Sequence, residues 1–387
     1  MDFSYDEEHE AVRQLADRIF AERATHERMK ELELDPGDDG PFDRALWGEL
    51  AAAGLVGIAL PEDVGGAGLD FVALSLVLEA AGRTAAYVPV VETMVHGALT
   101  IDRFGTPEQR QAWLPATARG DAVLTAALAE LVGDVVVRGT GSPATVATRV
   151  SPGTWRLEGT KACVPAGMSA DLVLVPASLV GTDNEPAGEA VFLLPTGADG
   201  VTRRRMDAAS RPEALIELSG VVLGDDAILG GTSADASAIL SSMTEHGAAA
   251  LAVVEAGACA ATIALISEFT KTREQFGKPI ATFQAVGQRA ADAYVDAEAV
   301  RLSAWEAAWR LSEGLAAAAE VATAKFWAAD GGQRVVHAAA HLHGGVSVDR
   351  DYPLHRYFLL TEQIELTLGG ATENLLALGR LLADEPV

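Results

Sequence analysis

A run of sixteen residues, Phe269 to Gln284, combines side chains that are suited to binding a nucleotide. Arg273 carries a planar, permanently charged guanidinium that fits a phosphate, and the Gln275 and Gln284 amides can hydrogen-bond an adenine or ribose edge. The Phe276 ring can stack on another ring, and the Gly-Lys-Pro sequence after it should end one helix before another begins at about residue 282. Alone, the run is equally typical of a helix end whose cations complement the helix dipole.

A second segment, from His337 to Gly345, allows two kinds of site. His337 and His341 lie four residues apart and would share a helix face, as metal-binding histidines do. The segment lacks the glutamate of an HExxH zinc motif, however, and no cysteine lies nearby, so we expect no metal site. Gly344 and Gly345 favour the alternative, because backbone without side chains can approach a ligand closely.

Two changes in residue pattern predict three domains. Residues 1–120 show the apolar spacing of helices, with a loop rich in glycine and proline after residue 53. Residues 121–232 contain short Val, Thr and Leu runs between Gly, Pro and Asn turns, which predict a β-domain. In residues 233–387 the helical period returns, with long Ala-rich segments at 247–271, 282–313 and 315–341.

Composition restricts the partners and the compartment. The 29 basic against 55 acidic residues give a net charge of −26, which repels nucleic acid and anionic membrane. The acidic N-terminus lacks a signal-peptide pattern, and the longest apolar run, Gly247–Ile266, is mostly Ala and Gly and contains Glu255. Cys163 and Cys259 match neither a disulfide framework nor a zinc pattern. We therefore expect a cytoplasmic protein with no nucleic-acid or membrane partner.

These motifs and the domain order resemble the acyl-CoA dehydrogenase family over nearly the whole chain. The Arg273 run is similar to the family's flavin-contacting signature. The segment ending in Gly344-Gly345 is similar to its Gln-x-x-Gly-Gly element, which touches the adenosine half of FAD in the neighbouring subunit. The resemblance implies a mainly α fold with a central β-barrel between a helical N-terminal domain and a C-terminal four-helix bundle. It also implies FAD, an acyl-CoA substrate and electron transfer flavoprotein as acceptor. The implied FAD-contacting residues are Arg273, Gln275, Phe276, Gln284, His341, Gly344 and Gly345.

The family's catalytic base is missing from its usual places. In the family, a glutamate removes the α-proton of the acyl thioester while the flavin N5 takes hydride from the β-carbon. Gly369 occupies the usual position of that glutamate and Gly247 a second family position, and glycine cannot act as a base. Glu245, close to the second position, is an alternative base. Glu373 lies about one helical turn from the first position and projects from a different point.

The elements that would hold the chain's own flavin are degraded as well. Residues 127–134 keep only fragments of the family's Thr-Glu-Pro-x-Ala-Gly-Ser-Asp motif. Cys163 stands where the family has a Trp that flanks the isoalloxazine ring. Pro165 stands where the family has a Thr that reaches the flavin N5, and Ala371 stands where it has a Thr that contacts FAD. The retained elements are those that would reach a partner's flavin. This pattern resembles the base-lacking subunit of actinobacterial heterotetrameric enzymes that desaturate steroid side-chain CoA thioesters, and it implies a glutamate-bearing partner subunit.

Three other interpretations stay open. One is a self-sufficient homo-oligomeric acyl-CoA dehydrogenase with an atypical base such as Glu245, and another is a flavin monooxygenase or nitroalkane oxidase on the same fold. Both need an intact local flavin site, which Cys163 and Pro165 disfavour. The third is a non-catalytic interaction module, which the retained flavin signature disfavours. The leading prediction is an FAD-dependent acyl-CoA dehydrogenase subunit that is active only with its partner.

Overall fold

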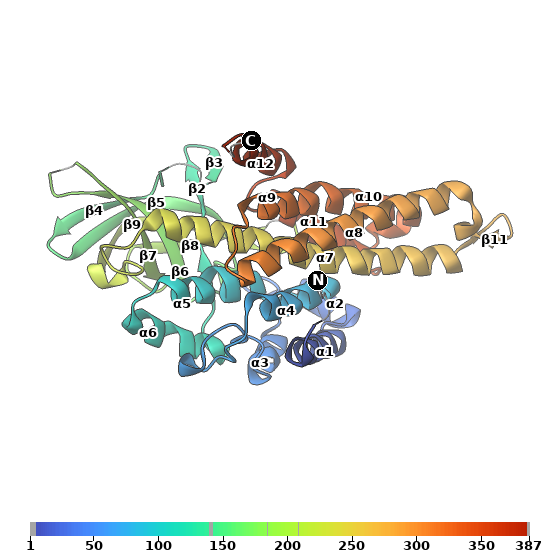
Figure 1. Ribbon diagram of the computed structural model, residues 1–387, viewed down its shortest axis with the longest axis horizontal. Coiled ribbons are helices and arrows are strands. Elements are labelled where there is room, and N and C mark those ends of the chain that lie inside the picture. The colour runs from blue at the N-terminus through green and yellow to red at the C-terminus, as the bar shows by residue number, and fades with distance from the viewer. Residues whose placement is uncertain (1–4, 139–141, 184, 208, 385–387) are drawn as a thin grey trace. The chain divides into compact units, whose positions relative to one another are not determined.

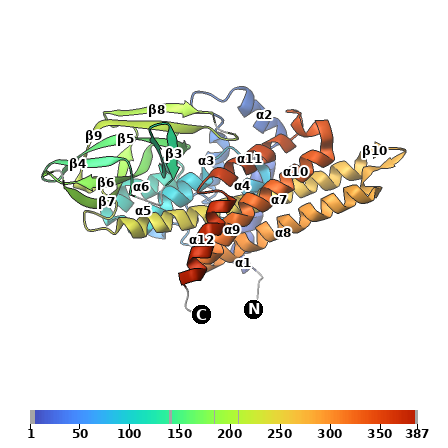
Figure 2. The same ribbon diagram turned by 90° about the horizontal axis from the view of Figure 1, so that it is seen from above.

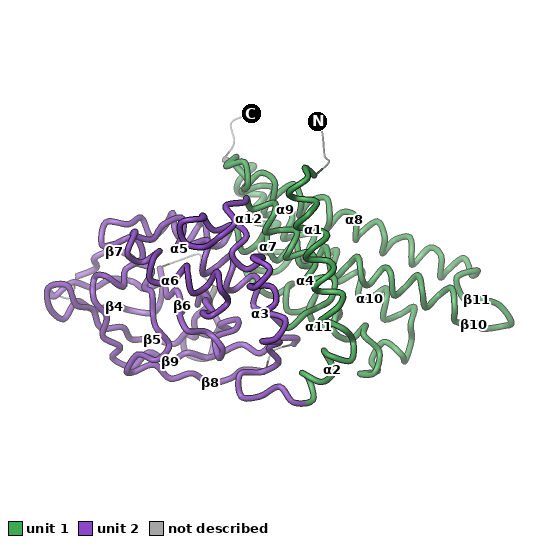
Figure 3. Tube along the Cα trace, turned by 90° about the horizontal axis from the view of Figure 1, so that it is seen from below, with its two compact units in different colours: residues 1–34, 70–87, 245–387 green, residues 35–69, 88–244 purple. Residues whose placement is uncertain are grey.

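The computed structural model describes residues 5–138, 142–183, 185–207 and 209–384. The chain divides into two compact units, each assembled from separate stretches (Figure 3). Unit 1 comprises residues 1–34, 70–87 and 245–387, and unit 2 comprises residues 35–69 and 88–244. The predicted boundaries near residues 120 and 232 follow the change from helix to strand and back, whereas the units follow packing. The three predicted domains therefore stay a prediction about secondary structure order.

Unit 1 is built from helices, most of which are labelled in Figure 1. They are α1 (Glu7–Arg23), α2 (His26–Leu34), α4 (Phe71–Thr84), the part of α7 (Ala236–Thr272) after residue 244, α8 (Gln284–Ser312), α9 (Ala318–Phe326), α10 (Gly332–His343), α11 (Leu354–Leu366) and α12 (Ala371–Asp384). A π-helical segment, Trp327–Gly331, joins α9 to α10. The long C-terminal helices confirm the predicted helical C-terminal domain.

Helix α7 packs closely on α4 because glycines stand at the contact. A Cβ atom on Gly82 would overlap the backbone of Val254, and one on Gly257 would overlap the backbone of Glu79. By length and composition α7 could cross a membrane, but 72% of its most apolar stretch is buried inside the protein. Its Ala- and Gly-rich composition thus allows close helix packing, as expected for a core helix.

Unit 2 contains a nine-stranded sheet and short helices. The helices are α3 (Arg44–Ala52), α5 (Thr100–Phe104), α6 (Pro107–Ala118) and the π-helix Val90–Leu99. The strands are β1 (Leu124–Ala126), β2 (Ala129–Val132), β3 (Val135–Arg138), β4 (Val146–Ser151), β5 (Thr154–Pro165), β6 (Leu172–Val180), β7 (Pro186–Pro195), β8 (Val201–Met206) and β9 (Glu213–Gly224). Their order is β1-β6-β4-β5-β2-β3, with β7 paired to β6, β9 to β5, and β8 to β9.

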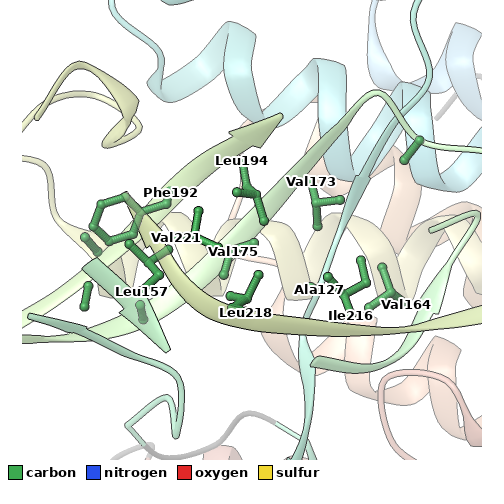
Figure 4. Packing of buried hydrophobic residues seen from close by; sticks show 14 of the residues in the cluster. Ala127, Leu157, Val164, Val173, Val175, Phe192, Leu194, Ile216, Leu218 and Val221 are labelled. Atoms are coloured by element: carbon green, nitrogen blue, oxygen red, sulfur yellow. The ribbon is translucent and has the colours of Figure 1, made fainter. Parts of the chain in front are cut away.

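The core of unit 2 lies between the strands of this curled sheet. Leu157 of β5, Phe192 of β7 and Leu218 of β9 point into one apolar cluster (Figure 4). Strands β5 and β9 pair antiparallel along most of their twelve residues, with a register shift between Lys161 and Val164. The predicted β-rich domain between helical segments is confirmed, and the predicted barrel takes the form of a curled sheet.

Candidate functional site

The Arg273 run forms a hairpin that projects from the end of α7. Strands β10 (Glu274–Gln275) and β11 (Lys278–Pro279) pair antiparallel, and Phe276 and Gly277 form the turn with φ angles of 54° and 75°. Two residues with positive φ indicate a type I′ turn, which suits a two-residue hairpin loop. The predicted break between helices is correct, but α8 begins at Gln284, because a 3-10 turn occupies Ile280–Thr282.

The hairpin presents its side chains outward. Phe276 is 92% exposed, and its ring meets the edge of Phe283 with a centroid distance of 6.1 Å. The side chains of Arg273, Gln275 and Gln284 are also exposed. A bulky residue in the left-handed region costs roughly 1–2 kcal/mol, and this ring gains almost no burial in return. Packing within unit 1 therefore does not account for the position of the Phe276 ring.

The Gly344-Gly345 segment lies at the same end of the helical unit. The His343 ring stacks on Phe269 of α7 with a centroid distance of 4.3 Å, and its Nε2 lies 3.1 Å from the Tyr352 hydroxyl. Residues of α7, α8, α10 and α11 form one apolar cluster there. Figure 2 shows α7 and α8 running side by side toward the hairpin. The structure thus brings the two predicted flavin-contacting segments to one region of unit 1.

This second segment is open as well. Gly344 has a φ of 60°, which favours glycine, and a Cβ atom on Gly344 or on Gly345 would have no described atom within 4 Å. His341 is exposed, so its ring is available to a ligand. The His343 Nδ1 lies 2.8 Å from the Ala339 carbonyl oxygen, and burial lowers the pKa of His343. Among the residues that the structure describes, no three His, Cys, Asp or Glu side chains could together hold a metal ion.

At Gly369, the position where the resemblance places the family's glutamate, the backbone itself favours glycine. Gly369 has a φ of 92°, and a Cβ atom there would lie 2.8 Å from Oε2 of Glu373. That oxygen accepts the Gly370 N–H at 2.9 Å, so Glu373 caps the start of α12. The buried Lys325 donates through Nζ to the carbonyls of Ile364 and Gly369, at 2.9 and 2.8 Å. Lys325 and Glu373 thus hold this turn through hydrogen bonds to its backbone, and residue 369 itself supplies no carboxylate.

The second predicted base position lies within α7. Gly247 is buried there, and Glu245, two residues earlier, is half-buried. Between them, His246 is buried against the edge of the Phe71 ring, with a centroid distance of 5.2 Å. The assignment of Glu245 as a base stays a prediction.

Glu255 on α7 is a buried acid whose structural role the sequence left unassigned. Its Oε1 accepts hydrogen bonds from the Thr361 hydroxyl at 2.8 Å and from the Cys259 thiol at 3.3 Å. Burial raises the pKa of Glu255 to about 8, although these hydrogen bonds and the charge of Lys325 oppose the change. At neutral pH the group is therefore mainly an uncharged acid inside the helical unit. Its position as the one acid in the longest apolar run was the available signal.

In unit 2, residues 127–134, which keep only fragments of the family's flavin motif, comprise β2 and the turn that leads into β3. Glu130 of β2 is paired with Lys161 of β5 at 2.6 Å and accepts the Thr145 hydroxyl at 2.6 Å. Burial lowers the pKa of Lys161 to about 8 despite this pairing. Glu130 is thus engaged inside the sheet.

The neighbouring segment of β5 offers little to an isoalloxazine. Cys163 has a φ of 48° within the register shift, and the Pro165 carbonyl oxygen accepts the Thr125 hydroxyl at 2.6 Å. Pro165 has no N–H to donate and no hydroxyl. The exposed cation, amides and ring of the hairpin are thus of types that can contact a nucleotide, whereas Pro165 lacks the hydroxyl that the resemblance leads us to expect beside a flavin ring.

Comparison with known proteins identifies the family. Models of the acyl-CoA dehydrogenase N-terminal and C-terminal domains match residues 6–121 and 237–379. The chain is 39% identical to acyl-CoA dehydrogenase FadE27 of Mycobacterium tuberculosis, with both proteins covered completely. It is also similar to a chain of the ChsE4-ChsE5 complex from the same species, at 37% identity and a TM-score of 0.90 over 100% of both chains. A chain from a variant of the Tcur3481-Tcur3483 steroid ACAD matches at 40% identity and a TM-score of 0.87 over 98% of both chains. The chain therefore belongs to the acyl-CoA dehydrogenase family of FAD-dependent oxidoreductases.

Proposed function

We propose that this protein is the subunit of a heteromeric acyl-CoA dehydrogenase that lacks the catalytic glutamate and completes the flavin site of a partner chain. The observation that carries the proposal is the Gly369 turn, in which the position of the usual base has a positive φ and is crowded by Glu373. A side chain at this position would have a strained backbone and would displace the Glu373 carboxylate, so the turn is suited to glycine and not to a glutamate. The turn is better explained by a chain that no longer supplies the base.

The hairpin also supports a role for this chain in completing the flavin site of its partner. Arg273, Gln275 and Phe276 point away from unit 1, although the Phe276 backbone is strained. Strain of this kind persists where a binding function maintains it. In the proposed complex, the Arg273 guanidinium pairs with the pyrophosphate or adenosine end of the partner's FAD, and the Phe276 ring stacks beside it.

The partner then supplies the general base and the main flavin pocket. Bound FAD provides the acceptor for the hydride that leaves the β-carbon of the acyl-CoA, and the partner's glutamate takes the α-proton. This chain holds the outer end of the cofactor and thereby fixes its position. We further propose that the electrons pass to an electron transfer flavoprotein and that the complex works in the cytoplasm.

The substrate proposal comes from the relatives. One similar structure is described as a steroid ACAD, and both similar structures contain two differently named chains. The chain matches each of them along nearly its whole length. We therefore propose a CoA thioester of a steroid side chain as the substrate and a second acyl-CoA dehydrogenase chain as the partner.

Titration of FAD into the reconstituted complex tests this proposal. Arg273→Ala removes a charge-assisted contact of roughly 1.5–3 kcal/mol, so FAD affinity should fall about tenfold to a hundredfold while the complex stays assembled. Arg273→Lys should give an intermediate loss, because lysine keeps the charge but not the planar fork. Lys271→Ala, in the last turn of α7, is the matched control and should leave affinity close to that of the wild type. Unchanged affinity in Arg273→Ala would contradict the proposal.

A further inference from the structure

Helix α1 is tied to the start of helix α4 by a single histidine. The two helices pack against each other in unit 1 (Figure 1). Nδ1 of His9 lies 2.7 Å from Oδ1 of Asp6, and Nε2 lies 3.0 Å from Oδ1 of Asp70. The same two carboxylate oxygens accept the backbone N–H groups of His9 at 2.8 Å and of Ala73 at 2.9 Å. One imidazole ring therefore links the N-caps of α1 and α4.

This geometry fixes the protonation state of His9. An ionised carboxylate only accepts hydrogen bonds, so a ring nitrogen that faces one must carry a proton. Both nitrogens of His9 face carboxylates, whereas a neutral imidazole has a single N–H. The His9 side chain is 17% exposed, so the two contacts are shielded in part from water. The bridge is therefore complete only when His9 is a positively charged imidazolium.

The neighbouring carboxylates favour the charged ring. Burial alone would lower the pKa of His9, but the hydrogen bonds and charges of Asp70 and Asp6 outweigh it and raise the pKa above its ordinary value of 6.5. The first turn of α1 carries further acids, namely Glu7, Glu8 and Glu10. Loss of the proton from His9 would leave Asp6 and Asp70 without the cation that they share, at an acidic helix start.

An aromatic contact connects the bridge to helix α8. The Tyr5 ring stacks on the His9 ring with a centroid distance of 6.5 Å, and it contacts the Trp305 ring of α8 at 5.8 Å. Burial raises the pKa of Tyr5 to about 12, so its hydroxyl stays uncharged while His9 titrates. The charged groups that act on Tyr5 come from α1, α4 and α8, and they are Glu10, Arg13, Glu79 and Arg301. Tyr5 thus lies between the titrating ring and α8.

We propose that the Asp6–His9–Asp70 bridge is a pH-sensitive latch that holds the first turn of α1 against α4 while His9 is protonated and releases it when His9 is neutral. A neutral ring turns a lone pair toward one of the two carboxylates, and the two repel each other. The rest of α1 stays in place, because Val12 and Ile19 are buried. Release is therefore confined to the first turn. The latch uses none of the residues proposed to contact FAD.

His9→Gln tests the latch, because glutamine keeps an N–H donor but cannot take up a proton. With a raised pKa, the stabilisation by the latch is complete below about pH 6.5 and is lost as pH rises through the higher pKa of the folded chain. Urea unfolding of the full chain should show a stability advantage of the wild type over His9→Gln at about pH 5.5. The ratio of their unfolding constants should shrink about threefold by about pH 8.5, as for a partly exposed ion pair.

Two comparisons separate the latch from a general effect of replacing a histidine. His337 is 52% exposed, and its Nε2 lies 3.8 Å from a single carboxylate, that of Glu362, so the effect of His337→Gln should change less with pH. Hydrogen exchange of residues 5–10, measured by mass spectrometry, should be slower in the wild type than in His9→Gln at about pH 6. That difference should shrink at about pH 8.5. A stability advantage that is independent of pH, or that changes equally for His337→Gln, would overturn the proposal.

An NMR titration of the histidine rings keeps the test decisive if His9→Gln does not fold. One ring of the wild type should titrate above about pH 6.5, and Asp70→Asn should lower the midpoint of that ring. Asparagine is as good an N-cap as aspartate, so this variant removes a charge and keeps the cap of α4. The absence of a ring whose midpoint responds to Asp70→Asn would contradict the latch.

Discussion

Replacing Gly369 tests whether the turn at the former base position is built for glycine. Gly369→Ala places a side chain at a φ of 92°, where its Cβ atom lies 2.8 Å from Oε2 of Glu373. An L-residue with a left-handed backbone costs roughly 1–3 kcal/mol. Displacing the Glu373 carboxylate from the Gly370 N–H costs a further 0.5–1.5 kcal/mol, approximately one hydrogen bond. We expect a loss of roughly 2–4 kcal/mol in the free energy of unfolding.

The assay is urea unfolding followed by tryptophan fluorescence, with Gly379→Ala as the matched control. Gly379 lies inside α12, and a Cβ atom there would have no described atom within 4 Å. Alanine in an open helical position should stabilise the protein by roughly 0.5–1 kcal/mol, so the two substitutions should have opposite signs. A Gly369→Ala variant as stable as the wild type would refute the reasoning about the turn.

Gly369→Glu carries the same strain and adds a carboxylate. It should be destabilised at least as much as Gly369→Ala. It should not create desaturase activity in the chain alone, because Cys163 and Pro165 stand where the resemblance places the residues that contact the flavin ring. Anaerobic reduction of added FAD by an acyl-CoA is the measurement. Substantial turnover from this single change would show that the local flavin site is intact.

Two further predictions concern buried and exposed side chains. Because the pKa of Glu255 is raised to about 8 in the folded chain, the group ionises in the unfolded chain first, and the free energy of unfolding falls as pH rises from about 4.5 to about 8. Glu255→Gln should therefore gain stability relative to the wild type as pH rises from about 5 to about 8, and the exposed control Glu313→Gln should show no such gain. The measurement is urea unfolding at several pH values, and a pH-independent difference between Glu255→Gln and the wild type would contradict the burial argument. Phe276→Asn gives the hairpin the Asn-Gly pair that type I′ turns prefer, so the isolated chain should be as stable as the wild type or slightly more stable. FAD affinity of the complex should nevertheless fall by about tenfold, and a normal affinity in this variant would exclude stacking by Phe276.

The sequence predicted the order of helices and strands because helical and strand periods differ clearly in this chain. The predicted segments at 282–313 and 315–341 match α8 and the stretch from α9 to α10 within a few residues, whereas α7 begins at Ala236, eleven residues before the predicted segment at 247–271. The hairpin was not predicted, because Phe-Gly is an unusual pair for a type I′ turn and its strain is visible only in the backbone. The two compact units also cut across the predicted domains, since packing between distant segments leaves no local sequence signal.

The sequence was sufficient to predict the segments of the candidate site whose residue types alone indicate nucleotide binding. The exposure of Arg273, Gln275 and Phe276 and the common location of the hairpin and Gly344 required the structure. The buried contacts of Glu255, Lys325 and Lys161 were missed, because a single buried charged residue looks like a surface residue until its neighbours are known. The sequence shows that Gly369 leaves the chain without a base at that position. Only the structure shows that the backbone there disfavours any side chain.

The most direct test of the shared flavin site is the flavin content of this chain purified alone and with a glutamate-bearing acyl-CoA dehydrogenase chain from the same organism. The chain alone should be largely colourless, and the mixture should bind FAD and dehydrogenate an acyl-CoA in the presence of an electron acceptor. Because each site then needs one of each chain, the complex should contain one FAD for every pair of unlike subunits. Stoichiometric FAD and acyl-CoA dehydrogenase activity in this chain by itself would contradict the proposal.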